Sequence, residues 1–270
     1  MSGLRLVLRA APADRVDLRS VCPAVVAGKT AREIAALPLG AAVNAPVLGD
    51  LFDVLAATRD ALVIEAGSDR LDFVGAGLIS GTRLIIDGDV GAHAGSGLAG
   101  GHLDIRGTVG AHLGSSMRSG LISITGSAGD NLGGPAPAKR DGLKGGIIHV
   151  GGDIGGYCGE RMRAGTVIAR GRIGDQAAPR MMGGTIFAQS GFGSGPGALL
   201  RRGTLIAPSA ARLLPTFVDC GRHRLLILDM MGRYLQGALG DLAPPAICTP
   251  VHRFMGDTAS IGRGELLLTT

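Results

Sequence analysis

The sequence predicts a mainly β chain whose short strands stack as successive coils, on the basis of three observations. Glycine recurs at an interval of 19 residues through the middle of the chain. Between the glycines, aliphatic residues recur with a period of two, as in a strand with one buried face. The 270 residues include only two Tyr, six Phe and no Trp, and such small apolar side chains suit thin, repeated layers.

The repeat is visible when each segment is started at the residue that opens a strand. The intervals are then 19 residues, apart from one of 26. These opening residues are Thr82, Gly101, Gly120, Gly146, Gly165, Gly184 and Gly203. Nine residues further along, six coils in succession carry glycine, which marks a corner that needs a positive φ or a close backbone approach. These structural glycines are Gly91, Gly110, Gly129, Gly155, Gly174 and Gly193.

Three columns of aliphatic residues are expected to fill the interior of the coils. Two come from the strands: Leu84, Leu103, Ile122, Ile148, Val167, Ile186 and Leu205, and then Ile86, Ile105, Ile124, Val150, Ala169, Ala188 and Ala207. The third precedes each strand: Ile79, Leu98, Met117, Leu143, Met162, Met181 and Leu200. Strands bounded by glycine leave no room for two helices per repeat, and the Leu and Asn ladder of leucine-rich repeats is missing. The architecture that remains is a single-stranded parallel β-helix of about seven coils, with neighbouring coils about 4.8 Å apart.

The ends of such a stack need covering, because open strand edges promote aggregation. We therefore expect an N-terminal cap over residues 1–60, the β-helix over residues 61–209 and a C-terminal cap over residues 210–270. In the first cap, "RLVLRA" and "RVDLRSV" are expected strands, and Thr30 with Glu33 fits a capping box that starts a short helix. In the last, residues 225–239 are expected to form a strand and then an amphipathic helix.

Composition narrows the classes of function. The net charge of +5 is carried almost wholly by arginine and points to an acidic partner. Nucleic acid is not expected, because recognition motifs and base-stacking aromatic residues are missing. No membrane association is expected either, since no segment is apolar enough to span a bilayer and the N-terminus lacks the apolar core of a signal peptide, so we expect a cytoplasmic protein. The four cysteines are far apart without a CxxC motif, which predicts neither a zinc site nor a disulfide framework.

A stripe of basic residues is the main candidate binding feature. Cations on adjacent coils repel one another unless they extend into water or meet anions. Two interpretations stay open: a site for a polyanionic ligand or an acidic partner surface, and a solvated face with weak surface ion pairs. The stripe consists of Arg118, Lys144, Arg163 and Arg201, with Arg161 and Arg180 close by.

Two further features have alternative interpretations. His93 and His112 are expected to stack one coil apart, as part of a metal site or of a polar ladder at a corner; with no third ligand apparent, no metal site is predicted. The extra residues of the third coil, around residues 135–142, are expected to form a stiff protruding loop that contacts another subunit or is an inert insertion. No GxSxG, HExxH, P-loop or Rossmann motif occurs in a suitable setting, so no catalytic residues are predicted.

The glycine repeat resembles the β-helix shared by the C-terminal domain of the large chain of glutamate synthase and the C subunit of formylmethanofuran dehydrogenases. The flanking sequences "KTAREIAALPLG", "VLGDLFDV" and "FMGDTASIGRGELLL" are more similar to the dehydrogenase C subunit. The resemblance covers nearly the whole chain and implies a right-handed coil. It also implies membership of one of two branches.

One branch is the bacterial formyltransferase/hydrolase complex of formaldehyde oxidation, which converts formyl-tetrahydromethanopterin to formate through a formyl-methanofuran-type carrier. The alternative is a molybdenum or tungsten formylmethanofuran dehydrogenase that reduces carbon dioxide in methanogenesis. The Arg-rich, Lys-poor composition favours the first branch.

In that branch the resemblance implies a non-catalytic subunit that assembles with the A, B and D subunits of the complex, of which A is amidohydrolase-like and D is the formyltransferase. Metals are then expected only in another subunit, and no cofactor is expected on this chain alone. A methanofuran-type carrier, which bears γ-linked glutamates, is expected at a subunit interface, where the basic stripe would hold its acidic arm.

Two other classes of function stay open from the residues themselves: an enzyme in its own right and a generic β-helix binding module. An enzyme in its own right would be active when expressed alone. A sugar-binding module would present aromatic platforms along one solvent face, and eight aromatic residues do not supply them.

Overall fold

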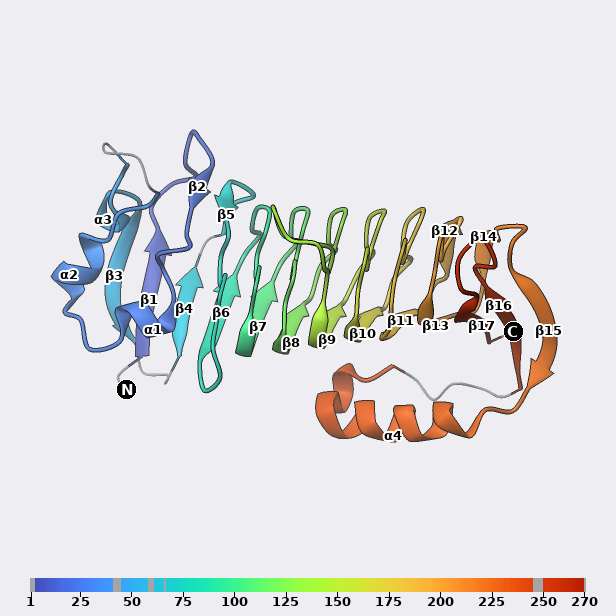
Figure 1. The fold of residues 1–270 in the computed structure, drawn as a ribbon. Helices are drawn as coiled ribbons and strands as arrows, with labels where there is room; N and C mark the ends of the chain where they lie inside the picture. The colour runs from blue at the N-terminus through green and yellow to red at the C-terminus, as the bar shows by residue number, and fades with distance from the viewer. Residues whose placement is uncertain (1–2, 41–44, 58–60, 66, 245–249, 270) are drawn as a thin grey trace.

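The protein is a long stack of β-coils with a smaller structured region at each end (Figure 1). The computed structural model describes residues 3–40, 45–57, 61–65, 67–244 and 250–269. A 13-stranded sheet runs the length of the molecule in the order β15-β16-β17-β13-β11-β10-β9-β8-β7-β6-β4-β1-β3. The two described ends of the chain lie at opposite ends of this stack. The prediction of a mainly β chain with a large parallel sheet is confirmed.

The central strands pair in parallel with the register of the sequence repeat. Leu84 lies opposite Leu103, and Leu103 lies opposite Ile122, so residues 19 apart in sequence are neighbours across the sheet. These strands are β4 (Leu62–Glu65), β6 (Arg83–Asp87), β7 (Ala99–Arg106), β8 (Ser119–Ile124), β9 (Lys144–Val150), β10 (Ala164–Ala169), β11 (Thr185–Ala188) and β13 (Arg202–Ala207).

A second parallel ladder closes the coils on another side. It consists mostly of single bridges in an apolar column that the sequence analysis missed: Val90, Val109, Ala128, Ile154, Ile173 and Phe192. Two short parallel pairs border it, β2 (Val16–Asp17) with β5 (Leu71–Asp72) and β12 (Phe192–Ser194) with β14 (Ala210–Arg212). Each coil is therefore tied to the next on at least two sides.

The glycines of the repeat have two different structural reasons. Gly174 represents the six predicted corner glycines, which do not have a positive φ: a Cβ there would lie 2.9 Å from the carbonyl carbon of Gly155 on the preceding coil. Gly203 represents the residues that open strands, and its φ of 111° lies where glycine is favoured. The expectation of either a close approach or a positive φ is thus confirmed: the corner column has the close approach alone, whereas the strand-opening glycines have both, since a Cβ on Gly203 would lie 2.9 Å from the carbonyl oxygen of Gly184.

The three predicted interior columns are buried, with one exception. Ile79 is 50% exposed, and Leu78, which is 2% exposed, occupies the interior in its place. The prediction for Ile79 was wrong because Leu78 and Leu98, the equivalent buried residues of neighbouring coils, are 20 residues apart, so that a 19-residue frame misses the position by one.

The N-terminal end covers the first coil with an antiparallel pair and short helices. β1 pairs with β4 of the stack in parallel and with β3 antiparallel, which places β3 at the edge of the sheet. The predicted capping box is confirmed, since Thr30 and Glu33 exchange hydrogen bonds at the start of α2. Of the second expected strand, only β2 forms. The elements are β1 (Gly3–Leu8), α1 (Pro23–Val26), α2 (Ala31–Ala35), α3 (Leu48–Leu51) and β3 (Phe52–Ala57).

The C-terminal end folds back on the stack. β17 continues the parallel ladder beside β13, and β16 and β15 follow it antiparallel. The amphipathic helix is confirmed as α4, but the strand expected at residue 225 is wrong, because the helix already begins at Leu226. None of the described helices is long and apolar enough to cross a membrane. The elements are β15 (Val218–His223), α4 (Leu226–Leu239), the 3-10 helix η1 (Gly240–Leu242), β16 (Val251–Gly256) and β17 (Arg263–Leu268).

Helix α4 packs against the outer face of the sheet. Its residues Leu228, Leu235 and Leu239 form an apolar cluster with Ile168 on β10 and other sheet residues. Strands β10, β11 and β13 are consequently buried on both faces over their last three residues, whereas the sequence analysis expected one buried face.

Candidate functional site

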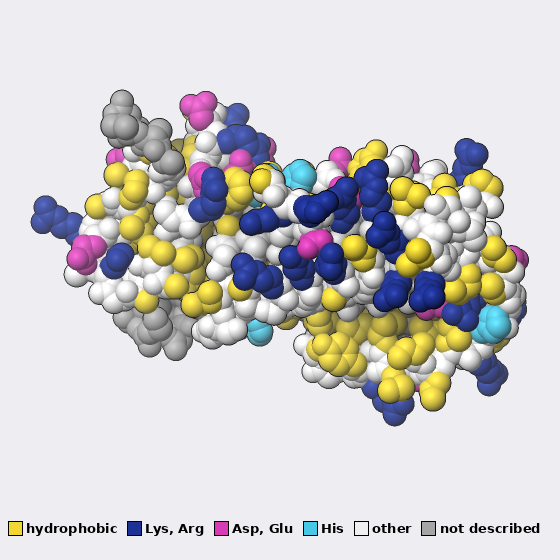
Figure 2. Space-filling view, in the orientation of Figure 1, with side chains coloured by type: hydrophobic (Ala, Val, Ile, Leu, Met, Phe, Trp, Pro, Cys, Tyr) yellow, Lys and Arg dark blue, Asp and Glu magenta, His cyan; other side chains and the backbone are white. Residues whose placement is uncertain are grey.

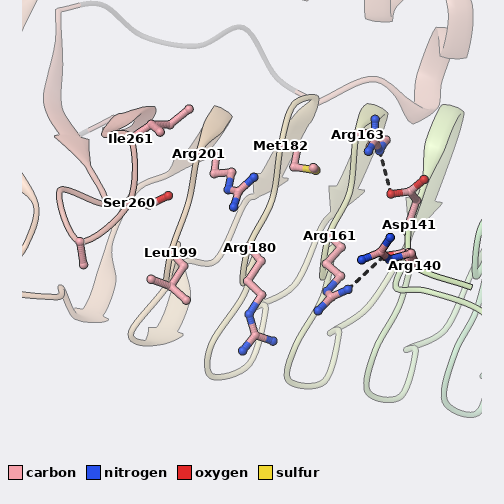
Figure 3. Close-up of a pocket in the computed structure, with 11 residues that line it drawn as sticks. Arg140, Asp141, Arg161, Arg163, Arg180, Met182, Leu199, Arg201, Ser260 and Ile261 are labelled. Carbon is pink, nitrogen blue, oxygen red and sulfur yellow. Dashed lines mark hydrogen bonds and ion pairs between the residues drawn. The ribbon is translucent and has the colours of Figure 1, made fainter.

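The regular stacking of the coils arranges basic side chains in a band along one face of the molecule. Figure 2 shows Lys and Arg side chains running along the stack in this view. Residues one coil apart are about 4.8 Å from each other, so successive members of a column are close neighbours. One row contains Arg163, Met182 and Arg201, which are 19 residues apart, and a second row contains Arg161 and Arg180 (Figure 3).

The second row has an unusual backbone. Arg161 and Arg180 have φ values of 48° and 55°, and Leu199 continues the row with a φ of 56°. This left-handed conformation is uncommon for residues other than glycine. A non-glycine residue held there at several equivalent corners is a reason to look for function.

A groove of about 920 Å³ lies along these two rows. Four of the six predicted basic residues line it together: Arg161, Arg163, Arg180 and Arg201. Arg118 and Lys144 do not line it. Arg140, which the sequence analysis placed only in the inserted loop, is a further member.

The inserted loop closes one end of the groove, where Arg140 and Asp141 lie (Figure 3). Its residue Asp141 accepts a hydrogen bond from Arg163 Nε at 2.8 Å and lies 3.2 Å from Lys144 Nζ. The next residue, Gly142, donates its backbone N–H to the carbonyl of Arg161. Residues 137–140 are exposed, so the loop protrudes as expected, but its base is tied to the basic stripe. The sequence analysis missed this because the insertion breaks the 19-residue register.

The charges of the groove are only partly compensated. The hydrogen bond from Arg163, with a further contribution from Lys144, lowers the pKa of the Asp141 carboxyl below its usual value. Glu160 lies 3.7 Å from both Arg161 and Arg180. Arg140 and Arg201 form no ion pair with any residue that the structure describes. Five arginines thus face one lining carboxylate, Asp141, and the site attracts anions.

Apolar residues interrupt both rows: Met182 lies between Arg163 and Arg201, and Leu199 ends the second row. Met182 and Leu199 stand where the repeat elsewhere places arginine, and Leu199 is 40% exposed. Ile261, on the turn between β16 and β17, is 55% exposed and lies near Arg201 and Leu199, at the end of the groove closest to the C-terminal strands (Figure 3). The groove can therefore receive an anionic chain along most of its length and an apolar group at one end.

The histidine column leads to a second hollow. His93 and His112 stack with ring centroids 4.6 Å apart, as expected, and Phe73 extends the stack. The same column continues as Asn131, Tyr157 and Gln176, which line a hollow of about 450 Å³ that shares Arg180 and Leu199 with the groove. Within the described ranges, no three His, Cys, Asp or Glu side chains are grouped so that they could hold a metal ion.

Comparison with known proteins assigns the chain to a family. No family model matches it. A crystal structure of the formyltransferase/hydrolase complex from Methylorubrum extorquens, in complex with methylofuran, contains a chain with a TM-score of 0.92 and 38% identity. The alignment covers 98% of this chain and 99% of that chain. The curated C subunit of the same complex and organism is 42% identical over 91 residues.

The chain belongs to the C-subunit family of formyltransferase/hydrolase complexes. The sequence match to the curated C subunit spans only 33% of that relative, while the structural match spans nearly the whole of the matched chain. The resemblance inferred from the sequence is confirmed, and the methanogenic dehydrogenase branch is not favoured. The basic groove is therefore a feature of a chain of this family.

Proposed function

We propose that the chain is a non-catalytic structural subunit of a formyltransferase/hydrolase complex that converts formyl-tetrahydromethanopterin to formate through a methanofuran-type carrier. The observation that carries the proposal is the full-length structural match, at 38% identity, to a chain of such a complex. In this role the chain assembles with the amidohydrolase-like A subunit, the B subunit and the formyltransferase D subunit. Metals and reacting groups belong to those partners, and this chain holds them in place.

Two further proposals concern architecture. The chain divides into a cap over residues 1–60, the coils over residues 61–209 and a second cap over residues 210–270. The coils form a single-stranded, right-handed β-helix of about seven turns. The parallel ladder from β4 to β13, with antiparallel strands at both ends of the sheet, supports this division.

Assembly is tested by purification from the native cell. An affinity-tagged chain should bring down the other subunits in fixed stoichiometry, identified by mass spectrometry. The isolated chain should have neither formyltransferase nor hydrolase activity. Activity of the chain alone, or its recovery without partners, would contradict the proposal.

The groove is proposed to hold the γ-linked glutamate arm of the carrier. Arg161, Arg163, Arg180 and Arg201 face the same groove, and bidentate arginine–carboxylate contacts suit such a polyanion. The ion pairs that Asp141 and Glu160 make there are exposed and therefore weak, so a ligand carboxylate can displace them. Arg118 and Lys144 are proposed to extend the site beyond the groove, on coils nearer the N-terminus.

Replacing Arg163 and Arg201 together by Gln tests this site in the purified complex. The carrier bound per complex should fall at least tenfold, because each lost charge-assisted contact contributes about 1.5–3 kcal/mol. Arg32→Gln, on the distant helix α2, is the matched control and should retain the carrier. Loss of a subunit instead would indicate an acidic partner surface, and unchanged carrier and assembly would refute the site.

A further inference from the structure

Helix α4 has a second apolar face that points away from the sheet. Leu228 and Leu235 pack on the sheet, whereas Leu226, Met230 and Tyr234, at positions i, i+4 and i+8, share the opposite face. These three are 70%, 53% and 63% exposed, and the neighbouring Ile227 is 59% exposed. Figure 2 shows hydrophobic side chains gathered over the α4 region. A cluster of large exposed apolar residues of this kind marks an interaction surface.

The charges beside this face make it complementary to itself. Asp229 and Arg233 are both exposed and lie one turn apart along one edge of the apolar stripe. If two copies of α4 pack antiparallel about a two-fold axis near residue 231, Asp229 of each copy lies opposite Arg233 of the other. The same axis places both ion pairs on the same side of the contact. A parallel two-fold pairing would put the charged edges of the two copies on opposite sides of the contact, where Asp229 could not meet Arg233.

Gly237 supports the same register. It lies on the exposed stripe, seven residues after Met230, inside a helix where glycine is unfavourable relative to alanine. A Cβ at this position would meet nothing within 4 Å in the chain, so packing inside the chain does not require glycine. In the antiparallel register given by Asp229 and Arg233, Leu226 of the second copy lies opposite Gly237, within one residue. Glycine would let that side chain approach the helix backbone.

We propose that the exposed face of α4 docks on the same face of a second copy of this chain, antiparallel and about a two-fold axis. A helix of 14 residues is about 21 Å long, which is a small contact compared with stable interfaces. The isolated chain should therefore dimerise weakly, and more tightly where other contacts hold two copies close together. This inference does not depend on the basic groove or on the proposed function.

Sedimentation of the full-length chain over a range of concentrations tests the proposal. Met230→Asp should abolish dimerisation. Asp229→Arg and Arg233→Asp should each raise the dissociation constant about tenfold, because both symmetric ion pairs become repulsive. The double variant Asp229→Arg/Arg233→Asp should restore the dissociation constant to within about threefold of wild type, since both ion pairs re-form with the charges exchanged. Failure of this rescue would overturn the register.

The two open glycines of α4 provide a matched comparison. Gly232 would also carry a Cβ with nothing within 4 Å, but it lies half-buried, away from the stripe. Gly232→Ala should leave dimerisation unchanged and Gly237→Ala should weaken it, although both substitutions favour the helix. Equal effects of the two substitutions would contradict the proposed contact. Circular dichroism and thermal unfolding of every variant show that the fold is intact.

Disulfide trapping measures the register directly, with Cys220 and Cys248 replaced by Ser. Met230 lies within about two residues of the axis, so Met230→Cys should cross-link two copies. Leu226→Cys should not, because its two copies would be about 15 Å apart along the helices at 1.5 Å per residue. The proposal would be overturned if the full-length chain stayed monomeric and the Met230→Cys variant formed no cross-link between two copies. It would also be overturned if Met230→Cys linked only to a different subunit of the assembled complex.

Discussion

Acid should destabilise this protein through His149, a buried histidine on β9. Its side chain is 2% exposed, and neither ring nitrogen has a hydrogen-bond partner within the described part of the chain. It lies beside Ile168, a member of the cluster that α4 covers. Burial, with a smaller contribution from the positive charge of Arg170, lowers the pKa of His149 from 6.5 to about 4. The folded protein therefore holds this imidazole neutral.

The sign follows from proton uptake. The unfolded chain protonates this histidine near pH 6.5 and the folded chain only near pH 4, so the unfolded state binds more protons between these values. The neutral His149 side chain makes its full contribution to the free energy of unfolding above pH 6.5, and this contribution is lost as the pH falls towards 4. At 1.36 kcal/mol per pH unit, the loss from this residue is about 3 kcal/mol.

Urea unfolding at pH 7, 6, 5 and 4.5 measures this loss. His149→Met removes the titration and fits the apolar surroundings, so its free energy of unfolding should depend less on pH by up to about 1.4 kcal/mol per unit. The free energy of unfolding of His149→Asn should depend on pH as little as that of His149→Met. At pH 7 His149→Asn should be less stable than His149→Met, because it buries a polar amide. Burial also lowers the pKa of His93, which adds a residual dependence of the same sign. A wild-type pH dependence in His149→Met would refute the reasoning.

Two more predictions concern packing. Gly174→Ala should lower the free energy of unfolding by about 1–3 kcal/mol, because the new methyl would lie 2.9 Å from backbone atoms of the preceding coil. Gly232→Ala, which has open space around it, should instead raise the free energy of unfolding by a few tenths to about 1 kcal/mol. Urea unfolding measures both, and similar effects of the two substitutions would show that close contact between coils is not the reason for glycine at residue 174. In the native protein, iodoacetamide at pH 8 should label the exposed Cys220 but not the buried Cys158, since burial raises the pKa of the Cys158 thiol to about 12. Peptide mass spectrometry measures the labelling of both cysteines. Equal labelling would show that the interior of the coils opens to the reagent.

The parallel stack could be predicted because each residue of the repeat meets its equivalent one coil away. Leu103, for example, packs between Leu84 and Ile122, the equivalent residues of the coils on either side. Residues that recur at the repeat interval in the sequence therefore form a continuous ladder in the structure. This same logic missed the buried bridge column of Val90 and Ile173, which is as periodic as the others. The signal is present in the sequence, but a single apolar residue close to glycines is also typical of a turn.

The helix against the sheet could not be predicted in the same way. Ile168, Phe187 and Ile206 lie on the outer face of their strands, where earlier coils carry Asp104 and Ser123. The change from polar to apolar along this column indicates a covered face, yet only a segment distant in sequence, α4, supplies the cover. Pairing of distant segments is decided by tertiary packing, and no local period reports it.

The candidate groove was predictable only in part for a related reason. The repeat correctly placed Arg161, Arg163, Arg180 and Arg201 on one surface, since columns are preserved by stacking. It did not place Arg140 or Asp141, whose positions depend on an insertion, or Ile261, which arrives from the returning C-terminal strands.

Specific binding by a repeated scaffold depends on departures from its repeat. A uniform ladder presents the same group on every coil and so can bind a polyanion in any register. Here Met182 and Leu199 interrupt the two arginine rows, and the inserted loop closes one end with Asp141 against Arg163. The groove therefore has two distinguishable ends: the Asp141–Arg163 ion pair lies at one, and the apolar Leu199 and Ile261 lie near Arg201 at the other. An anionic chain in it would therefore have a preferred direction, which identical coils alone could not impose.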